Sequence, residues 1–147
     1  MLNIFIKTFN ELSAIELYNL LQLRSEVFVV EQNCIYQDID GKDQKALHVI
    51  AYKNEAIVAY TRIFKSLDYL PEASIGRVVV KKDERKYGYG YDIMNASITA
   101  IEDNFNEKTI SLSAQAYLKH FYNSLGFVEK GKEYLEDGIP HILMIRS

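Results

Sequence analysis

The chain has 147 residues, of which 48% are hydrophobic and 25% charged, and its formal net charge is -3. This size and balance are typical of one globular core, so we expect a single domain over residues 1–147. The slight acidity leaves no basic surplus for a phosphate backbone and argues against nucleic acid as a partner. The longest apolar runs, such as Val78–Val80, are too short to span a bilayer. The first residues alternate like a strand and do not resemble a signal peptide, so we expect a cytoplasmic protein without a membrane partner.

Apolar periodicity predicts strands and helices along the whole chain. A strand at residues 2–9 precedes a helix at 12–28, in which Ser13 is the expected N-cap and Glu16 follows three positions later. Strands are predicted at 47–52, 56–64 and 73–80, and a second helix at 90–105. The remainder predicts a strand at 109–114, a short helix at 118–125 and strands at 127–135 and 141–146. The fold class is therefore mixed α/β, with antiparallel strands first and one parallel crossover around the second helix.

Two glycines one residue apart, Gly88 and Gly90, lie where the strand at 73–80 gives way to the second helix. Backbone N–H groups and the helix dipole attract anions at such a point, and glycine lets a ligand approach the backbone closely. Arg85 and Lys86 add positive charge, which suits a pyrophosphate. The spacing fits neither a P-loop nor a dinucleotide fingerprint, and a simple turn without a ligand is the alternative interpretation of so short a motif.

A second motif, F-Y-x-x-x-G-F at residues 121–127, follows about thirty residues later. Together with R-x-x-G-x-G at 85–90, it resembles the GNAT superfamily of acyl-coenzyme A dependent N-acetyltransferases. The stretches "LLQLRSEVFVVEQNCIYQDIDGKD", "IGRVVV", "AQAYLKHFYNSLGF" and "DGIPHILM" are similar to its ElaA branch. This resemblance covers most of the chain.

The resemblance implies a mostly antiparallel sheet in which the strand at 75–80 splays from its parallel neighbour at 109–114. Acetyl-coenzyme A is then the co-substrate, with pantetheine in the gap and pyrophosphate at the glycine turn. The residues implied to bind it are Val78, Val79, Val80, Arg85, Lys86, Tyr87, Gly88, Tyr89, Gly90, Tyr91 and Gln115. Tyr122 matches the family's general acid, and a phenol that is protonated at neutral pH suits that role. A packed aromatic with a satisfied hydroxyl is the alternative for Tyr122, and Phe121 is expected in the core.

The family's common position for a general base holds no carboxylate here, since "ASIGRVVV" offers only Ser74, Gly76 and Arg77. A base must therefore come from elsewhere, or from a chain of waters. The candidates for the base and for acceptor binding are Glu31, Asp38, Asp40, His48 and His141. Each also has an ordinary structural or solvated interpretation.

Metal and thiol chemistry are not expected. "DIDGKD" departs from a calcium loop because its glycine comes fourth and Val49 occupies the twelfth position. Its acidic side chains either attract a cationic acceptor or form a solvated turn. A lone Cys34 makes no internal disulfide and is expected to be a small apolar residue.

The sequence thus predicts an enzyme that transfers an acetyl group from acetyl-coenzyme A to a primary amine of unknown identity, by direct attack in a ternary complex. A non-enzymatic acyl-coenzyme A sensor on the same fold is the alternative. The acceptor is a small-molecule or peptide amine, and the edge left by the last strands could pair with a second copy of the chain.

Overall fold

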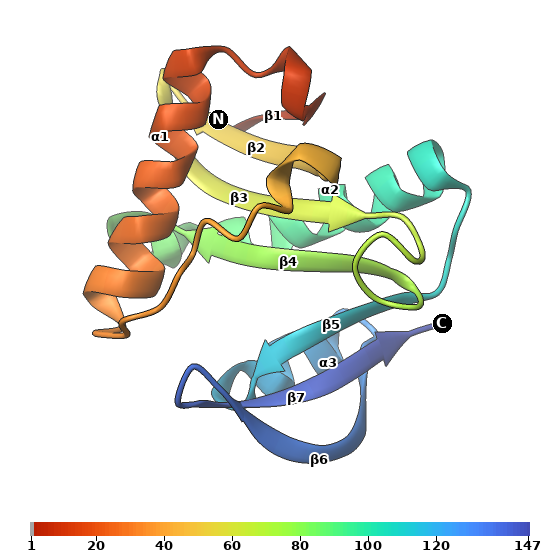
Figure 1. Cartoon of the computed structure of the whole chain (residues 1–147). Helices are drawn as coiled ribbons and strands as arrows, with labels where there is room; N and C mark the ends of the chain where they lie inside the picture. Colours follow the sequence, from red (N-terminus) through yellow and green to blue (C-terminus); the bar gives the residue numbers. More distant parts are fainter. Residues whose placement is uncertain (1) are drawn as a thin grey trace.

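The computed structural model describes residues 2–147. Within them, seven strands form one sheet in the order β1-β2-β3-β4-β5-β7-β6 (Figure 1). The strands are β1 (Leu2–Thr8), β2 (Leu47–Lys53), β3 (Ala56–Phe64), β4 (Ala73–Val80), β5 (Ile110–Gln115), β6 (Val128–Glu136) and β7 (Ile139–Arg146). The α-helices are α1 (Ala14–Arg24), α2 (Tyr89–Phe105) and α3 (Lys119–Ser124). Shorter helical turns are η1 (Phe9–Glu11), η2 (Ser25–Glu31), η3 (Asp43–Lys45), η4 (Lys82–Tyr87) and η5 (Ala116–Leu118).

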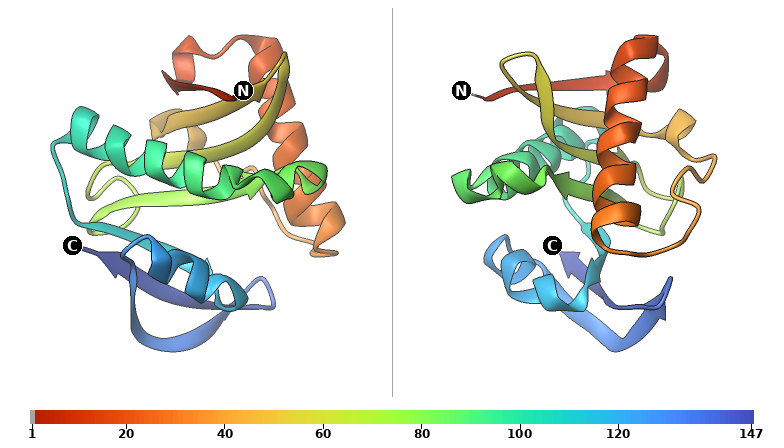
Figure 2. Two further views of the ribbon diagram at one scale, coloured as in Figure 1. Left: turned by 180° about the vertical axis from the view of Figure 1, so that it is seen from behind. Right: turned by 90° about the vertical axis from the view of Figure 1, so that its left-hand side faces the viewer.

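The predicted mixed α/β fold is confirmed, and the sheet separates two apolar cores. Figure 2 shows α1 on one face, with α2 and α3 on the other. Val49 and Ile50 are adjacent in β2 and both fully buried, because successive strand side chains point to opposite faces and each face is covered. Each fully buried side chain of this kind stabilises the fold by about 1.5–3 kcal/mol. Among residues 2–147, none of the helices is both long and apolar enough to cross a membrane.

The first helix begins where the sequence predicts, because the Ser13 hydroxyl accepts a hydrogen bond from the Glu16 amide at 3.0 Å. The apolar pattern that runs to Phe28 does not continue as regular α-helix, since residues 25–31 form the π-helical turn η2. Such wide turns are frequent at functional sites. Here η2 carries the end of the helix toward the open part of the sheet (Figure 1).

The parallel pair β4 and β5 diverges almost at once, as expected from the sequence. Among the described residues the two strands pair only at Ala73 with Ile110 and Ser74 with Ser111. A bulge between Tyr60 and Arg62 of β3 lies opposite Arg77 of β4, whose φ is +49°. A bulge of this kind bends its strand and re-aims the side chains that follow. The result is a gap in the middle of the sheet, bordered by backbone edges that carry no ladder partner in residues 2–147.

Candidate active site

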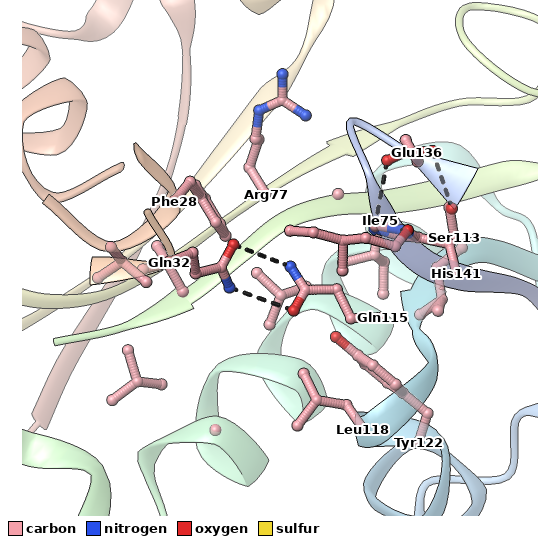
Figure 3. A pocket seen from close by; sticks show the side chains of 18 of the residues that line it. Phe28, Gln32, Ile75, Arg77, Ser113, Gln115, Leu118, Tyr122, Glu136 and His141 are labelled. Atoms are coloured by element: carbon pink, nitrogen blue, oxygen red, sulfur yellow. Dashed lines mark hydrogen bonds and ion pairs between the residues drawn. The ribbon is translucent and has the colours of Figure 1, made fainter. Parts of the chain in front are cut away.

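A cavity of about 880 Å³ occupies the gap between β4 and β5 (Figure 3). The segment around η2 forms one wall with Phe28, Glu31, Gln32 and Cys34, and β4 forms another through residues 75–80. The start of α2 and the helix α3 close one end, and the turn between β6 and β7 closes the other. This cavity gathers most of the residues that the sequence singles out.

The β4 wall presents backbone groups as well as side chains. Val78, Val79 and Val80 all line the cavity, and their strand has no β5 partner at this level. Amides in such a strand edge can pair with an extended ligand in the way that a further strand would. The Val80 carbonyl already accepts a hydrogen bond from Arg85 Nε at 3.0 Å.

Gly88 and Gly90 are glycines for different reasons. Gly88 has φ +75° and ends η4 while it caps α2, and a Cβ added there would meet nothing within 4 Å. The first N–H groups of α2 have no intrahelical acceptor, and Gly88 offers no capping side chain, so this end of the helix is open to an anion. Gly90 has no positive φ, and a Cβ there would stand 3.3 Å from Cζ of Phe121. Close packing against an aromatic ring therefore explains Gly90.

The remaining residues of this turn divide into two groups. Arg85 and Tyr91 line the cavity, whereas Lys86, Tyr87 and Tyr89 do not. The rings of Tyr87 and Tyr89 lie 5.4 Å apart, and the Tyr87 ring also receives the ammonium group of Lys86 at 5.4 Å. These three side chains therefore belong to the outer surface of the turn, so any role in binding falls to their backbone N–H groups.

Tyr122 lies at the end of the cavity that α3 closes. Its ring packs edge to face against Phe121, with centroids 5.0 Å apart, and against Phe127 at 6.1 Å. The side chain is almost fully buried, yet it lines the cavity, and no hydrogen bond of its hydroxyl is formed with residues 2–147. Burial, with a smaller effect from Tyr117, raises the pKa of Tyr122 above its ordinary value. The phenol therefore keeps its proton throughout the neutral range.

Gln115 of β5 and Gln32 after η2 join their side-chain amides across the gap. Each amide donates to the other at 3.2 Å (Figure 3). Gln115 thus has a protein partner on the opposite wall, and Gln32 was not among the site residues predicted from the sequence. An amide pair of this kind can open and offer both a donor and an acceptor to a ligand.

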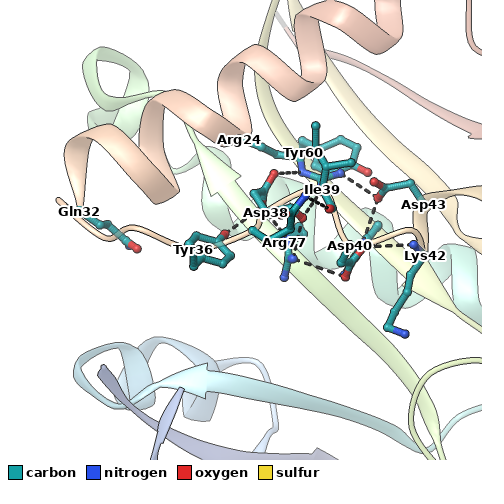
Figure 4. Close-up of polar contacts among 12 residues, drawn as sticks. Arg24, Gln32, Tyr36, Asp38, Ile39, Asp40, Lys42, Asp43, Tyr60 and Arg77 are labelled. Carbon is teal, nitrogen blue, oxygen red and sulfur yellow. Dashed lines mark hydrogen bonds and ion pairs between the residues drawn. The ribbon is translucent and has the colours of Figure 1, made fainter. Parts of the chain in front are cut away.

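Asp38 and Asp40 lie in a network of ion pairs outside the cavity lining (Figure 4). Arg24 is fully buried and binds Asp38 at 2.9 Å and Asp43 at 2.8 Å, while Arg62 binds Asp40 at 2.6 Å and Asp43 at 2.9 Å. Arg77 adds a contact of 2.8 Å to Asp38. Neither sequence interpretation of these carboxylates, a solvated turn or an acidic surface for a cation, fits a network with three compensating arginines. We correct both and assign Asp38 and Asp40 a structural role.

His48 is also removed from the candidates. It is fully buried in β2 and does not line the cavity. Its Nδ1 lies 2.5 Å from the Tyr60 hydroxyl, and its Nε2 lies 2.9 Å from the Asp43 carbonyl oxygen. Burial lowers the pKa of His48, so the ring is held as a neutral bridge inside the protein.

The other two candidates do line the cavity. Glu31, at the end of η2, forms a bidentate ion pair with Arg85, which lowers the pKa of its carboxyl group. His141 lies in β7 beside Glu136 of β6, a residue that the sequence did not single out. Both Glu136 and Asp137 line the cavity near His141. The stretch "EDGIPHI" at 136–142 was expected to line the acceptor groove, but neither carboxylate was singled out within it.

The comparisons with known proteins agree with this geometry. A model described as "Acetyltransferase (GNAT) domain" matches residues 11–147. The chain belongs to the GNAT acetyltransferase family. It is 48% identical to Protein ElaA of Escherichia coli over 140 residues, which cover 94% of this chain and 92% of that protein.

Solved structures of GNAT relatives have the same fold. The crystal structure of Escherichia coli ElaA matches with a TM-score of 0.93 and 44% identity over the whole of both chains. An acyl-CoA N-acyltransferase from Pseudomonas aeruginosa matches with a TM-score of 0.93 and 40% identity, again over both complete chains. The predicted GNAT fold, the likeness to the ElaA branch and the assignment as an N-acetyltransferase are confirmed.

Proposed function

We propose that the protein transfers an acetyl group from acetyl-coenzyme A to a primary amine, and that both substrates are bound together when the amine attacks the thioester. The observation that carries this proposal is that one cavity joins the free edge of β4, the open start of α2 and the side chain of Tyr122. Two substrates that meet in one cavity need no covalent enzyme intermediate, because positioning lowers the barrier to direct attack.

The donor half of the site follows from the backbone. Backbone groups of Val78 and Val80 would pair with pantetheine, and the turn at 85–91 would hold the pyrophosphate through its N–H groups and the Arg85 guanidinium. Gly88 leaves room on that side, since nothing lies within 4 Å of the position of a Cβ. Gln115 would contact the coenzyme after its amide leaves Gln32.

The transfer itself needs two things from the protein. The Val79 amide, the sequence-based candidate for donation to the thioester carbonyl oxygen, points toward β3, because the Lys81 amide two residues further on donates to Val58 and strand amides alternate between the two edges. The Val78 amide, on the gap side, would instead donate to that oxygen, where negative charge develops as the amine attacks. When the carbon–sulfur bond breaks, Tyr122 would give its proton to the departing thiolate. The hydroxyl is suited to this step because it has no other acceptor among the described residues and its raised pKa keeps it protonated.

The amine would reach the thioester from the opposite side of the gap. The face of β5, β6 and β7 that looks away from α3 carries no helix within residues 2–147 (Figures 1 and 2). Gln32, Glu136 and His141 line this side of the cavity. A small amine or a terminal amine of a peptide fits a site that is open in this way.

The test combines calorimetry with a thiol-release assay. Saturable binding of acetyl-coenzyme A, together with release of free thiol that depends on one of a mixed panel of amines, is the expected result. Binding without release for any amine would support a sensor of acyl-coenzyme A. If the well-folded protein bound no acetyl-coenzyme A, the proposed function would be wrong.

A further inference from the structure

Three polar side chains on the open face of the last strands form a connected set. Ser113 of β5, Glu136 of β6 and His141 of β7 all line the cavity, and dashed lines join them in Figure 3. Among residues 2–147, β4 offers no carboxylate at the cavity, so the proton of an acceptor amine needs another destination. None of the proposed transfer steps, which use β4 amides and Tyr122, involves these three side chains.

The contacts of His141 fix the tautomer of its ring. Nδ1 lies 2.7 Å from the carbonyl oxygen of Ile139, and a carbonyl can only accept, so Nδ1 carries the hydrogen. In the neutral ring Nε2 therefore presents a lone pair. That lone pair lies 3.5 Å from Oε2 of Glu136, where two electron-rich atoms face each other. Nε2 is therefore the ring atom that can accept a proton, and Glu136 lies beside it.

Neighbouring strands hold Glu136 in place for this contact. The Ser113 hydroxyl donates to Oε1 of Glu136 at 3.2 Å, which leaves Oε2 toward His141. Tyr134 hydrogen-bonds to Ser113 and stacks its ring on the imidazole, with centroids 6.2 Å apart. The His141 side chain is only 8% exposed, whereas that of Glu136 is 47% exposed. The imidazole is thus rigidly placed, and the carboxylate gives the proton a path to solvent.

We propose that His141 takes the proton from the ammonium group of the acceptor, and that Glu136, beside the same nitrogen, positions that ammonium group and stabilises the imidazolium that forms. This rests on the proposed function. The proton passes from nitrogen to Nε2, and the freed lone pair forms the carbon–nitrogen bond to the acetyl carbon. The carbon–sulfur bond breaks, Tyr122 supplies the proton that the sulfur takes, and the second proton that the nitrogen loses as it becomes an amide restores the phenol. The acceptor is therefore an amine that enters as a cation.

Titratable and charged groups from several elements lie near His141. Tyr134 and Glu136 contact it from β6, and Asp137 of the following turn lines the same cavity. Cys34 reaches that turn from the segment after η2, where its thiol donates to the Asp137 carbonyl at 3.3 Å. From β4, the guanidinium of Arg77 lines the cavity but is neutralised by Asp38. Two carboxylates, those of Glu136 and Asp137, therefore line this end of the cavity, where a cationic amine would enter.

The experiment compares two amines of nearly equal size in the His141→Gln variant. Ethylamine is protonated at neutral pH, whereas 2,2,2-trifluoroethylamine is largely free base because its fluorines withdraw electron density. Thiol release is measured for each amine at saturating acetyl-coenzyme A. We expect kcat/KM for ethylamine to fall by about 100-fold or more, as is usual when a general base is lost. For trifluoroethylamine, which has no ammonium proton to remove, the fall should be no more than about tenfold.

Variants of Glu136 test its positioning role. Glu136→Gln should reduce kcat for ethylamine and change the acid limb of the pH–rate profile, and Glu136→Asp should restore part of the rate. His120→Gln on α3 and Glu133→Gln on β6 are matched controls, because both residues are exposed and neither lines the cavity. Both controls should behave as the wild type.

Two results would overturn the proposal. One is an equal loss for both amines in His141→Gln, which would show a structural effect. The other is a wild type that releases thiol with neither amine. Calorimetry with acetyl-coenzyme A separates a failure of the His141 proposal from a failure of the proposed function. If the protein still binds acetyl-coenzyme A, the proposed coenzyme site is not contradicted.

Discussion

Arg85 and Glu31 hold each other across the mouth of the cavity, with Nη1 to Oε2 at 2.5 Å and Nη2 to Oε1 at 2.8 Å. The pair joins the turn before α2 to the end of η2, 54 residues away in the chain. In the proposed complex a pyrophosphate would use the same guanidinium. Glu31 therefore competes with the coenzyme for Arg85, so the ion pair must open or be shared when the ligand binds.

Removing this competitor should tighten the binding of acetyl-coenzyme A. In Glu31→Gln, the Arg85 guanidinium is no longer held by a carboxylate. The pair is partly exposed, and such ion pairs contribute about 0.2–1 kcal/mol, so the expected decrease in Kd is roughly 1.4-fold to fivefold. Calorimetry in low salt measures it, and the difference should shrink as salt screens the charges.

Glu26→Gln is the matched control, because Glu26 is an exposed residue of the same turn η2 and does not line the cavity. It removes the same charge without contact to Arg85. If both variants tightened binding equally, the effect would come from net charge rather than from this ion pair.

The hydroxyl of Tyr122 should matter for turnover and not for binding. Tyr122→Phe keeps the ring that packs between Phe121 and Phe127 and removes only the acid. Loss of a general acid typically reduces rates by about 10²–10⁴-fold. We expect a fall of that order in kcat, with an unchanged Kd for acetyl-coenzyme A by calorimetry. A variant with wild-type turnover would remove Tyr122 from the mechanism.

The pH dependence of this step has a definite sign. Because burial raises the pKa of Tyr122 above its usual value near 10, the phenol remains a proton donor up to that pH. Ionisation of Tyr122 should therefore cause no loss of rate between pH 7 and about 9. If the wild-type rate does decline in that range, the rate of Tyr122→Phe should decline in the same way. A decline seen in the wild type alone would mean that the phenol ionises at a much lower pH than its burial predicts.

Gly90 should prove to be a packing residue. In Gly90→Ala, the new Cβ meets Cζ of Phe121 at 3.3 Å, and the ring it displaces packs directly on Tyr122. We expect a lower kcat with little change in the Kd of acetyl-coenzyme A. Adding Phe121→Leu should relieve the contact. The decrease in kcat of the double variant should therefore be smaller than the product of the two single-variant decreases. Strictly additive losses would show that Gly90 and Phe121 act independently.

The cavity-lining residues of β4, α2 and α3 were easier to predict from the sequence than those of the opposite wall. Gly88, Arg85 and Tyr122 lie within short motifs, and local chain geometry alone brings the first two to one turn. The opposite wall of the cavity is assembled from η2, β5, β6 and β7, so its contacts depend on tertiary packing. Gln32 and Gln115 meet across 83 residues, and no local pattern indicates such a pair.

The buried charges were missed for a different reason. Arg24 follows Leu23 on the apolar side of α1, and Arg62 lies within the nearly continuous apolar run of β3. A buried arginine requires a carboxylate partner. Arginines at these two positions therefore indicate that the aspartates of "DIDGKD" fold back onto the sheet. The composition of the loop by itself, rich in aspartate with one glycine, is typical of a solvated turn.

The same network predicts how the protein responds to acid. Burial opposes ionisation of Asp43, but hydrogen bonds and charges from Arg24 and Arg62 outweigh it and lower its pKa; Arg62 acts on Asp40 in the same direction. A carboxyl group with a lowered pKa in the folded state stabilises the protein above its unfolded pKa of about 3.9. This contribution is lost as the pH falls through the folded value, so the free energy of unfolding should decrease below about pH 4.

Asp43→Asn tests the network directly. Asp43 is the carboxylate that Arg24 and Arg62 share, at 2.8 Å and 2.9 Å, and the substitution removes its charge from both guanidinium groups. Removing one member of a buried ion pair typically costs about 3–5 kcal/mol, and urea unfolding at pH 7 should show a loss of that order. Between pH 5 and 3 the variant should lose less further stability than the wild type, because one of the responsible carboxyl groups is gone. Glu55→Gln, in the exposed β2–β3 turn, is the control and should leave both values unchanged. An equal acid response in Asp43→Asn and wild type would show that other carboxyl groups govern acid unfolding.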